Sequence, residues 1–287
     1  MMADDSRRGG LLLIATPIGN LADVTARAAS ALATLDLLLC EDTRVTARLL
    51  GHLDVQPTVR SYHDHNADRQ RPDIIARLHA GAQIGLVSDA GTPLVNDPGY
   101  KLVRACIEEG IPVTALPGPS APVVALLLSG LPPDRFYFGG FLPNRKTARR
   151  AAMAAVANLD ATLLFFESAQ RLTACLADAA AVLGNRPAAV ARELTKRYEE
   201  VRRDRLTVLA AHYADVGPPK GEIVVVIGGA DAASAQLDAA SLDRRLRAAM
   251  AQASVKDAAA IVAGETGFPR KAIYAQALKL RAEEESR

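Results

Sequence analysis

Short runs of apolar residues alternate with longer segments of helical periodicity through the first 120 residues of the chain. The runs are Leu11–Ala15, Leu37–Cys40, Gln83–Val87 and Pro112–Leu116, with a brief one centred on Val59. Each run is continuously apolar, which indicates a strand that is buried on both faces. Strands of this kind separated by helices predict an α/β fold with a doubly wound parallel sheet. Right-handed crossovers would place the loops that follow the strands at one edge of that sheet.

The segment from Ile84 to Tyr100 contains the most informative of these loops. A strand ends near Val87, small residues follow, and Asp97-Pro98 predicts the start of the next helix with the Asp as its cap. Gly91 would let the backbone approach a ligand closely, and Asp89 offers two acceptor oxygens to an amine or a ribose. The alternative is an ordinary connection between a strand and a helix.

The loops at this edge carry few positive charges. They are Thr16–Asn20, Glu41–Arg44, Ser88–Pro93 and Pro117–Ala121, and Arg44 is their one cation. The first strand is not followed by Gly-x-Gly-x-x-Gly, and the chain has no Gly-x-x-x-x-Gly-Lys-Ser/Thr. A bound polyphosphate is therefore disfavoured. A cationic ligand such as S-adenosylmethionine is compatible with these loops, although they do not identify it.

The pattern changes after residue 130. Ser129–Asp134 is typical of a linker, and the strands expected beyond it are Phe136–Phe141, Thr162–Phe166, Ala189–Leu194, Tyr198–Val201 and Glu222–Ile227. A Gly/Ala/Ser-rich tether over Gly228–Leu237 precedes helices separated by a turn at Gly264–Pro269, which is typical of a helix-turn-helix. We predict a disordered leader over residues 1–10, an α/β domain over 11–130, a second, mixed-sheet α/β domain over 131–229, and a helical domain over 238–287. That last domain could bind nucleic acid or serve as a packing or dimer contact.

Composition limits the binding partners, metal sites and cellular compartment that the protein can have. The formal net charge of +2 does not by itself indicate a nucleic-acid partner, so any basic surface must be local. The three cysteines are far apart, and the His and acidic residues form no ligand spacing, so we expect no metal. The N-terminal apolar run is too short for a signal sequence or a membrane span. We therefore expect a cytoplasmic protein.

Seven segments, in order, resemble the ribosomal RNA small subunit methyltransferase I family of the tetrapyrrole methylase superfamily. They are ATPIGNLADVT, LCEDTRVTARLL, GLVSDAGTPLVNDPG, ALPGPSA, FFESAQR, ARELTKRYEE and PKGEIVVVIGG. The resemblance implies methyl transfer from S-adenosylmethionine to the ribose 2′-hydroxyl of a cytidine in the decoding region of 16S rRNA, free or in the small ribosomal subunit. It also implies two α/β domains with the cofactor in the cleft between them, and a homodimer.

The same resemblance implies cofactor contacts from both domains. The residues are Pro17, Gly19, Asp89, Gly91, Thr92, Val95, Ser120, Ala121, Phe166, Glu193 and Gly221. Two of these have structural alternatives. Phe166 could belong to the core, and Glu193 could form an ion pair with a neighbouring cation such as Lys196.

The reaction also needs a proton acceptor, because a ribose hydroxyl is a weak acid. A positioned base contributes on the order of 10²–10⁴-fold to such a step. The candidates are Asp42, Asp89, His63 and Glu167. We favour Asp42, which follows a strand at its carboxyl end.

The segment 144–150 is the strongest candidate for contacts with RNA phosphates. It carries Arg145, Lys146, Arg149 and Arg150 and no acid. Two other functions stay open. One is a methylase of a small tetrapyrrole, which would need an apolar trough and no such basic run. The other is a non-enzymatic, ligand-sensing regulator that binds nucleic acid.

Overall fold

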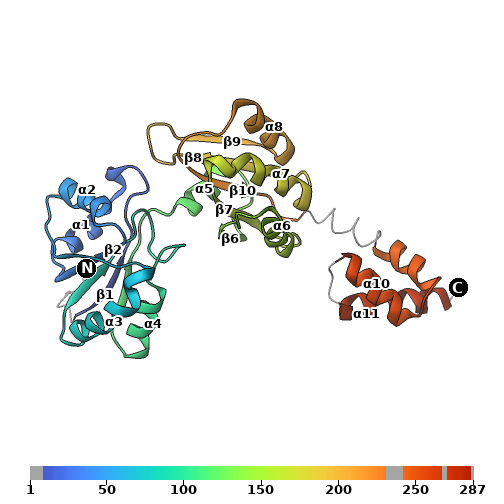
Figure 1. The fold of residues 1–287 in the computed structure, drawn as a ribbon, viewed down its shortest axis with the longest axis horizontal. Helices are drawn as coiled ribbons and strands as arrows, with labels where there is room; N and C mark the ends of the chain where they lie inside the picture. The colour runs from blue at the N-terminus through green and yellow to red at the C-terminus, as the bar shows by residue number, and fades with distance from the viewer. Residues whose placement is uncertain (1–8, 231–241, 267–269, 286–287) are drawn as a thin grey trace. The chain divides into compact units, whose positions relative to one another are not determined.

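A computed structural model describes residues 9–230, 242–266 and 270–285 (Figure 1). The chain forms two compact units. The larger contains Met1–Ala154 and Ala161–Gly228, and the smaller contains Ala155–Asp160 and Gly229–Arg287. Among the described residues, no helix combines the length and the apolar character that crossing a membrane requires.

The first sheet of the larger unit is entirely parallel. Its strands are β1 (Gly10–Ile14), β2 (Leu37–Cys40), β3 (Val59–Ser61), β4 (Gln83–Leu86) and β5 (Val113–Leu116), in the order β3-β2-β4-β1-β5. This arrangement confirms the predicted doubly wound sheet. Because the strands are parallel, the loops that follow them emerge at one edge.

Helices cover both faces of this sheet, which explains why its inner strands β1, β2 and β4 are largely apolar. The helices are α1 (Ala26–Leu32), α2 (Thr43–Leu53), α3 (Asp64–His79) and α4 (Tyr100–Glu108). On one face, Leu11 and Ile84 pack in a core with Ile74 of α3 and Leu102 of α4. On the other, Leu12, Ile14 and Leu38 pack with Leu32 of α1 and Leu49 of α2.

The second sheet is mixed, as predicted. Its strands are β6 (Phe136–Phe141), β7 (Thr162–Ser168), β8 (Pro187–Arg192), β9 (Glu200–Arg205) and β10 (Glu222–Ile227), in the order β6-β7-β10-β8-β9. Only β6 and β7 pair in parallel. The helices around it are α5 (Ala121–Ser129), α6 (Lys146–Ala155), α7 (Leu172–Leu183) and α8 (Leu206–Val216).

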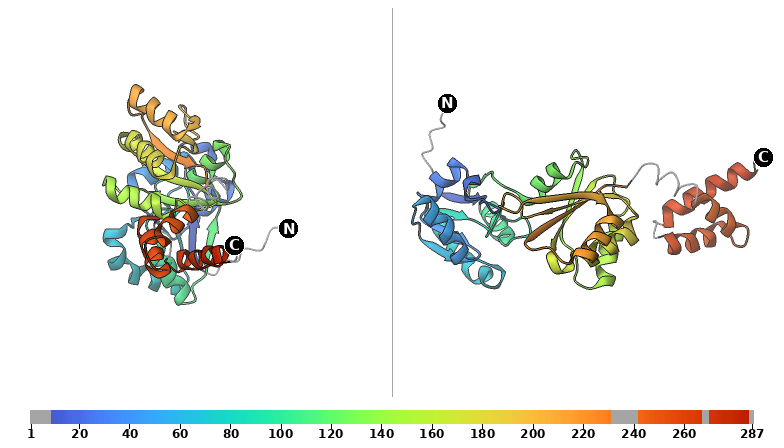
Figure 2. Two further views of the ribbon diagram at one scale, coloured as in Figure 1. Left: turned by 90° about the vertical axis from the view of Figure 1, so that its right-hand side faces the viewer. Right: turned by 90° about the horizontal axis from the view of Figure 1, so that it is seen from above.

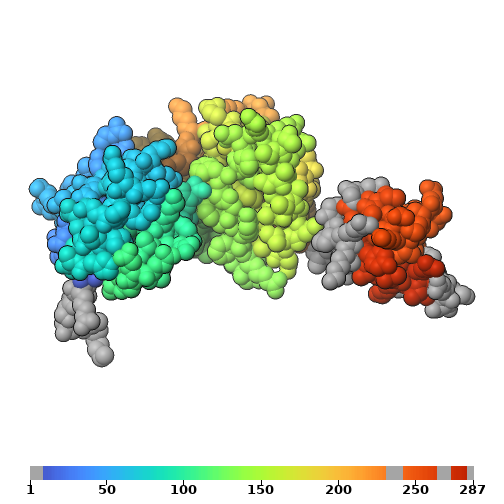
Figure 3. All heavy atoms as spheres, turned by 60° about the horizontal axis from the view of Figure 1, so that its bottom comes forward, coloured from blue at the N-terminus to red at the C-terminus, as the bar shows by residue number. Residues whose placement is uncertain are grey.

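Helix α5 belongs to the core of the second sheet. Ala125 and Leu126 of α5 pack with Leu164 of β7, Ala189 of β8 and Val224 of β10. Helices α7 and α8 lie on the opposite face of that sheet (Figure 2). In the space-filling view, the residues of the first sheet and its helices, coloured blue to teal, adjoin those that follow them in green and yellow (Figure 3). The loop from β5 into α5 therefore connects the two halves of the larger unit, one around each sheet.

Several of the predicted element boundaries are wrong. Strand β8 begins at Pro187 rather than Ala189, and β9 begins at Glu200 rather than Tyr198. Helix α4 begins at Tyr100 behind Gly99, whose φ is 128°, so Asp97 is not its cap. Helix α3 begins at Asp64, directly after its N-cap residue His63, and the Asn66 side chain accepts the His63 N–H at 2.9 Å. Both helix starts depend on backbone geometry that apolar periodicity does not report.

The smaller unit contains a helix over residues 242–250, α10 (Val255–Thr266) and α11 (Arg270–Glu285). Leu246, Val262, Ile273 and Leu280 are buried in a core of their own. Helix α10 continues through Thr266, so the first three residues of the turn predicted over Gly264–Pro269 are helical, and the rest of that turn lies outside the described residues. Most of the predicted leader and tether lies outside the described residues, and Gly10 already belongs to β1.

Candidate functional site

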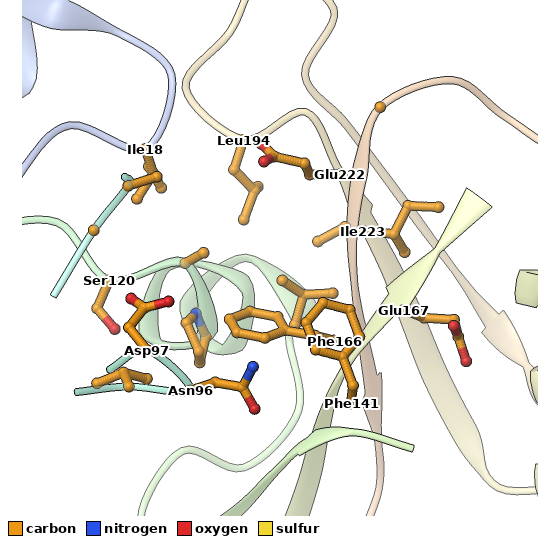
Figure 4. Close-up of a pocket in the computed structure, with 18 of the residues that line it drawn as sticks. Ile18, Asn96, Asp97, Ser120, Phe141, Phe166, Glu167, Leu194, Glu222 and Ile223 are labelled. Atoms are coloured by element: carbon orange, nitrogen blue, oxygen red, sulfur yellow. The ribbon is translucent and has the colours of Figure 1, made fainter. Parts of the chain in front are cut away.

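A cavity of about 440 Å³ lies where the loops after β1 and β4 and the start of α5 meet the second sheet (Figure 4). Its volume is in the range of small-molecule sites. The polar side is formed by the first half of the larger unit, including Asp89, Thr92 and Asp97. The apolar side is formed by the second half, including Phe166 and Ile223. No Lys or Arg is among the described residues that line the cavity.

Backbone hydrogen bonds hold the loops of the first sheet together. The Thr16 N–H donates to the Gly91 carbonyl at 2.9 Å, and the Gly91 N–H donates back at 3.1 Å. Gly91 has a φ of 79°, and a Cβ there would lie 3.2 Å from Cγ2 of Ile18. The Thr92 hydroxyl donates to the Pro119 carbonyl at 3.0 Å, which adds the loop after β5. The three loops therefore form one preorganised wall.

The two carboxylates on this wall differ in their surroundings. Oδ1 of Asp89 accepts the backbone N–H of Asp42 at 3.0 Å, which fixes the orientation of its carboxylate. Asp97 is partly buried, and burial raises the pKa of its carboxyl group. The negative charge of Asp89 raises that pKa further, while a hydrogen bond from Ser88 lowers it.

The loop that carries Asp97 is held against the second sheet. Leu94 and Asn96 both have a φ of 71°, a conformation that non-glycine residues adopt only when their surroundings enforce it. A Cβ at Gly140 would lie 2.6 Å from Oδ1 of Asn96, so only glycine there admits the Asn96 side chain. The close-up shows Asn96 and Asp97 across the cavity from Ile223 (Figure 4).

Glu193 and Gly221 form a support at the second sheet. Oε1 of Glu193 accepts the backbone N–H of Glu222 at 3.1 Å and is 2.7 Å from Nζ of Lys196. A Cβ at Gly221, where φ is 97°, would lie 2.3 Å from the same oxygen. A Cβ at Gly19 would lie 2.4 Å from Cγ of Lys196. Lys196, which pairs with Glu193 and packs closely against Gly19, thus connects the loop after β1 to the second sheet.

The structure brings eight of the eleven predicted cofactor residues to the cavity. They are Asp89, Gly91, Thr92, Val95, Ser120, Ala121, Phe166 and Gly221. Pro17 and Gly19 flank Ile18, which lines the cavity. Glu193 lies behind Gly221 and forms an ion pair with Lys196, the structural role that the sequence offered as an alternative. Binding of a cofactor by these residues stays a prediction.

Sequence reasoning missed several lining residues. They include Ile18, Asn96, Asp97, Phe141, Leu194 and Ile223. Asp97 lies in the segment that the sequence identifies as most informative, but its position before Pro98 indicated a helix cap. The apolar members carry no sequence signal that distinguishes them from core residues.

The surroundings of Asp42 do not favour it as a base. Its carboxylate caps α2 by accepting the backbone N–H of Arg44 at 2.8 Å, and it pairs with the Arg44 guanidinium at 2.6 Å. The hydrogen bonds from Arg44 lower the pKa of Asp42 to about 2. A carboxylate of such low pKa is a weak proton acceptor. Asp42 is also absent from the described lining of the cavity.

Two further candidates for the base are engaged elsewhere. Glu167 is buried in β7, and its Oε1 accepts the Ser168 N–H at 2.8 Å and lies 3.3 Å from Nε of Arg171. Its carboxylate points away from the centre of the cavity (Figure 4). His63 precedes α3 and lies 3.2 Å from the side-chain nitrogen of Asn66.

The basic run at the start of α6 is compensated in part. Arg149 is buried and its Nη2 is 2.6 Å from Oδ2 of Asp178, while Nε of Arg150 is 2.7 Å from Oδ1 of the same carboxylate. The run itself contains no acid, but the carboxylate of Asp178 on α7 compensates two of its four cations. Arg145 and Lys146 are exposed.

Within the described part of the chain, no three His, Cys, Asp or Glu side chains are grouped so that they could hold a metal ion. Cys40, Cys106 and Cys175 are free and buried. Burial raises the pKa of the Cys175 thiol, and the carboxylate of Glu167 raises it further.

Two family models match the sequence. The model described as Tetrapyrrole (Corrin/Porphyrin) Methylases matches residues 10–210. The model described as the RsmI C-terminal HTH domain matches residues 236–281.

Two relatives that align over nearly their full length have the same name. A protein of Mesorhizobium japonicum named Ribosomal RNA small subunit methyltransferase I is 47% identical, with 94% of this chain and 92% of the relative covered. A protein of the same name from Escherichia coli O157:H7 is 44% identical, with 96% of each chain covered.

Solved structures share the fold of the larger unit. A diphthine synthase aligns with a TM-score of 0.58 at 18% identity, covering 76% of this chain and 90% of that one. A uroporphyrin-III C-methyltransferase from Thermus thermophilus, complexed with S-adenosylhomocysteine, aligns with a TM-score of 0.52 at 20% identity, covering 77% and 97%.

Proposed function

Since the chain belongs to the ribosomal RNA small subunit methyltransferase I family of the tetrapyrrole methylases, we propose that it methylates the ribose 2′-hydroxyl of a cytidine in the decoding region of 16S rRNA. The methyl donor is S-adenosylmethionine. The single observation that carries the proposal is a cavity that fits this donor. Carboxylates from both halves of the larger unit line it, without a Lys or Arg among its described lining residues.

The charge of the cavity suits the donor. S-adenosylmethionine carries a sulfonium and an amine, and the side chains of Asp89 and Asp97 line the cavity, whereas the carboxylate of Glu222 at its border is paired with Lys196 at 2.6 Å. Asp89 is held by the Asp42 N–H, so it is positioned before the donor arrives. Glycines in the loops allow the protein backbone to approach the donor closely. Because the loops are already fixed, less conformational entropy is lost when the donor binds.

The main task of the protein in this reaction is to align the methyl donor with the ribose hydroxyl. A sulfonium methyl group is already activated, so most of the acceleration comes from holding the ribose oxygen in line with the carbon–sulfur bond. The apolar wall around Phe166 and Ile223 excludes water from the reacting atoms, which strengthens the electrostatic interactions there.

RNA binding uses surfaces outside the cavity. Arg145 and Lys146 are exposed at the start of α6, and the Arg150 side chain is 42% exposed although it contacts Asp178. We assign phosphate contacts to these three cations and a structural role to Arg149. The smaller unit supplies a second RNA-binding element, as its match to a helix-turn-helix family indicates. We further infer a cytoplasmic homodimer that acts on 16S rRNA or on the small ribosomal subunit.

A methyl-transfer assay tests the proposal. Purified protein is incubated with tritiated S-adenosylmethionine and either 30S subunits or free 16S rRNA, and the labelled nucleoside is identified by mass spectrometry. We expect 2′-O-methylcytidine in at least one substrate. Label on a base, or no label in either substrate, would contradict the proposal. Asp73→Asn, on the exposed face of α3, is the control that should retain full activity.

A further inference from the structure

A second cavity of about 340 Å³ adjoins the first at Asp97. Its lining comprises Tyr62, Asp64, Ala67, Asp97, Pro98, Gly99, Tyr100 and Lys101. Asp97 lines both cavities, so the two hollows meet at this residue. A nucleotide whose base and phosphate occupy the second cavity would bring its ribose to this junction, where the hydroxyl can meet both the donor's methyl group and the Asp97 carboxylate.

The chemistry of the second cavity fits an unstacked nucleotide. The Tyr100 ring is 63% exposed and can stack on a base. The Lys101 ammonium is exposed and lies 3.4 Å from Asp68, an exposed pair that contributes little and can exchange for a phosphate. An aromatic ring, a cation and a carboxylate around one hollow are the groups that recognise a base, a phosphate and a ribose hydroxyl.

The backbone around Asp97 frees its carboxylate for this role. Gly99 rather than Asp97 caps α4, so the helix does not use the Asp97 oxygens. A Cβ at Gly99 would lie 2.6 Å from Cδ2 of Leu86, which fixes the segment against β4. The strained Asn96 and its contact at Gly140 fix the other side. Asp97 is thus held rigidly between the two cavities.

We propose that the second cavity receives the target nucleotide and that Asp97 accepts the proton of its 2′-hydroxyl as the methyl group is transferred. The oxygen–carbon bond forms as the carbon–sulfur bond breaks, and its electron pair stays on sulfur. The hydroxyl proton moves to an Asp97 oxygen and then to solvent. The products are the 2′-O-methyl ribose and S-adenosylhomocysteine. This inference rests on the proposed function and names the base that it requires.

The electrostatics around Asp97 support this assignment. Burial and the Asp89 charge raise the pKa of Asp97, which makes it a stronger base than an ordinary aspartate, whereas the pKa of Asp42 is about 2. Other ionisable groups surround it. They are Asp89, Glu41 and Asp64 near the first sheet, Glu167 and Glu222 across the donor cavity, and Tyr62, Tyr100 and Lys101 in the second cavity.

The test compares two variants. Asp97→Asn keeps the shape of the side chain but removes the carboxylate that accepts the proton, and Asp97→Glu keeps a carboxylate on a longer side chain. Single-turnover methyl transfer to 30S subunits is measured at saturating S-adenosylmethionine, and donor affinity is measured by calorimetry. At saturating donor, we expect Asp97→Asn to lose about 10²–10⁴-fold in rate, far more than the change in donor affinity accounts for, and Asp97→Glu to recover part of that rate. The wild-type rate should fall as the pH drops through the Asp97 pKa, and this fall should be absent from the residual activity of Asp97→Asn.

A second substitution tests the nucleotide site. Tyr100→Ala should raise the KM for the subunit with little change in donor affinity, and Asp73→Asn should match wild type in every measurement. A wild-type rate in Asp97→Asn, or a rate loss explained by lost donor affinity, would overturn the role of Asp97. An unchanged KM in Tyr100→Ala would overturn the nucleotide site. These outcomes can be distinguished from failure of the proposed function, in which case the wild-type protein itself would transfer no methyl group to the RNA.

Discussion

Asp178→Ala is predicted to destabilise the larger unit strongly. The Asp178 side chain is 4% exposed and contacts two guanidinium groups, those of Arg149 and Arg150. Arg149 is itself buried, and its Nη1 also donates to the Asn144 carbonyl at 3.2 Å. Removing the carboxylate leaves a buried cation without its counter-ion.

The magnitude follows from that burial. Removing one partner of a buried ion pair lowers the free energy of unfolding by about 3–5 kcal/mol, whereas replacing both partners by apolar residues often leaves it unchanged. Arg149→Met combined with Asp178→Leu should therefore unfold close to wild type. The matched control is Asp73→Ala, which removes a carboxylate that also contacts two arginines, Arg60 and Arg77, but on an exposed surface. Its effect should be much smaller.

Urea denaturation followed by circular dichroism measures these differences. The pH dependence gives a second check. Burial alone would raise the pKa of Asp178, but the hydrogen bonds and charges of Arg150 and Arg149 together outweigh it and lower the folded-state pKa below its ordinary 3.8. The stabilisation by this carboxylate is complete above the unfolded-state value and is lost as the pH falls through the lower folded-state value. A urea midpoint for Asp178→Ala equal to that of Asp73→Ala would refute the structural role of the pair. In that case Arg149 would return as a candidate for RNA binding.

Three further predictions concern binding. Asp89→Ala should weaken S-adenosylmethionine binding in calorimetry, because the wall carboxylate is lost; unchanged affinity would remove Asp89 from the donor site. Arg145→Glu with Lys146→Glu should weaken RNA binding and flatten its logarithmic salt slope by about 1.5, since each phosphate contact contributes about 0.7–0.9; an unaltered slope would place the phosphates elsewhere. Deleting residues 238–287 should lower methyl transfer to RNA while sparing donor binding, and full transfer by the truncated chain would make the smaller unit dispensable.

The parallel sheet could be predicted because its inner strands β1, β2 and β4 are almost entirely buried. Leu37–Cys40 reads as one apolar run, and β2 has these same bounds, since its neighbours cover it on every side. Strands β6 and β10 likewise match their predicted bounds, Phe136–Phe141 and Glu222–Ile227. Apolar continuity is a local signal, and here the tertiary structure agrees with it.

The features that could not be predicted depend on contacts between distant segments. Asp178 lies 29 positions after Arg149, so no local pattern shows that the basic run is compensated. Asp97 stands before a proline, a position typical of helix caps, and only the left-handed conformations of Leu94 and Asn96 direct it to the cavity. Both errors concern charged residues whose role is set by their three-dimensional surroundings.

A crystal structure with S-adenosylhomocysteine is the most direct test of the central claim, that the donor binds in the cavity between the two sheets. We predict electron density for the ligand against Asp89, Gly91 and Thr92 on one side and Gly221 on the other, with its sulfur facing Asp97. Density at any other surface of the protein, with this cavity empty, would contradict the account.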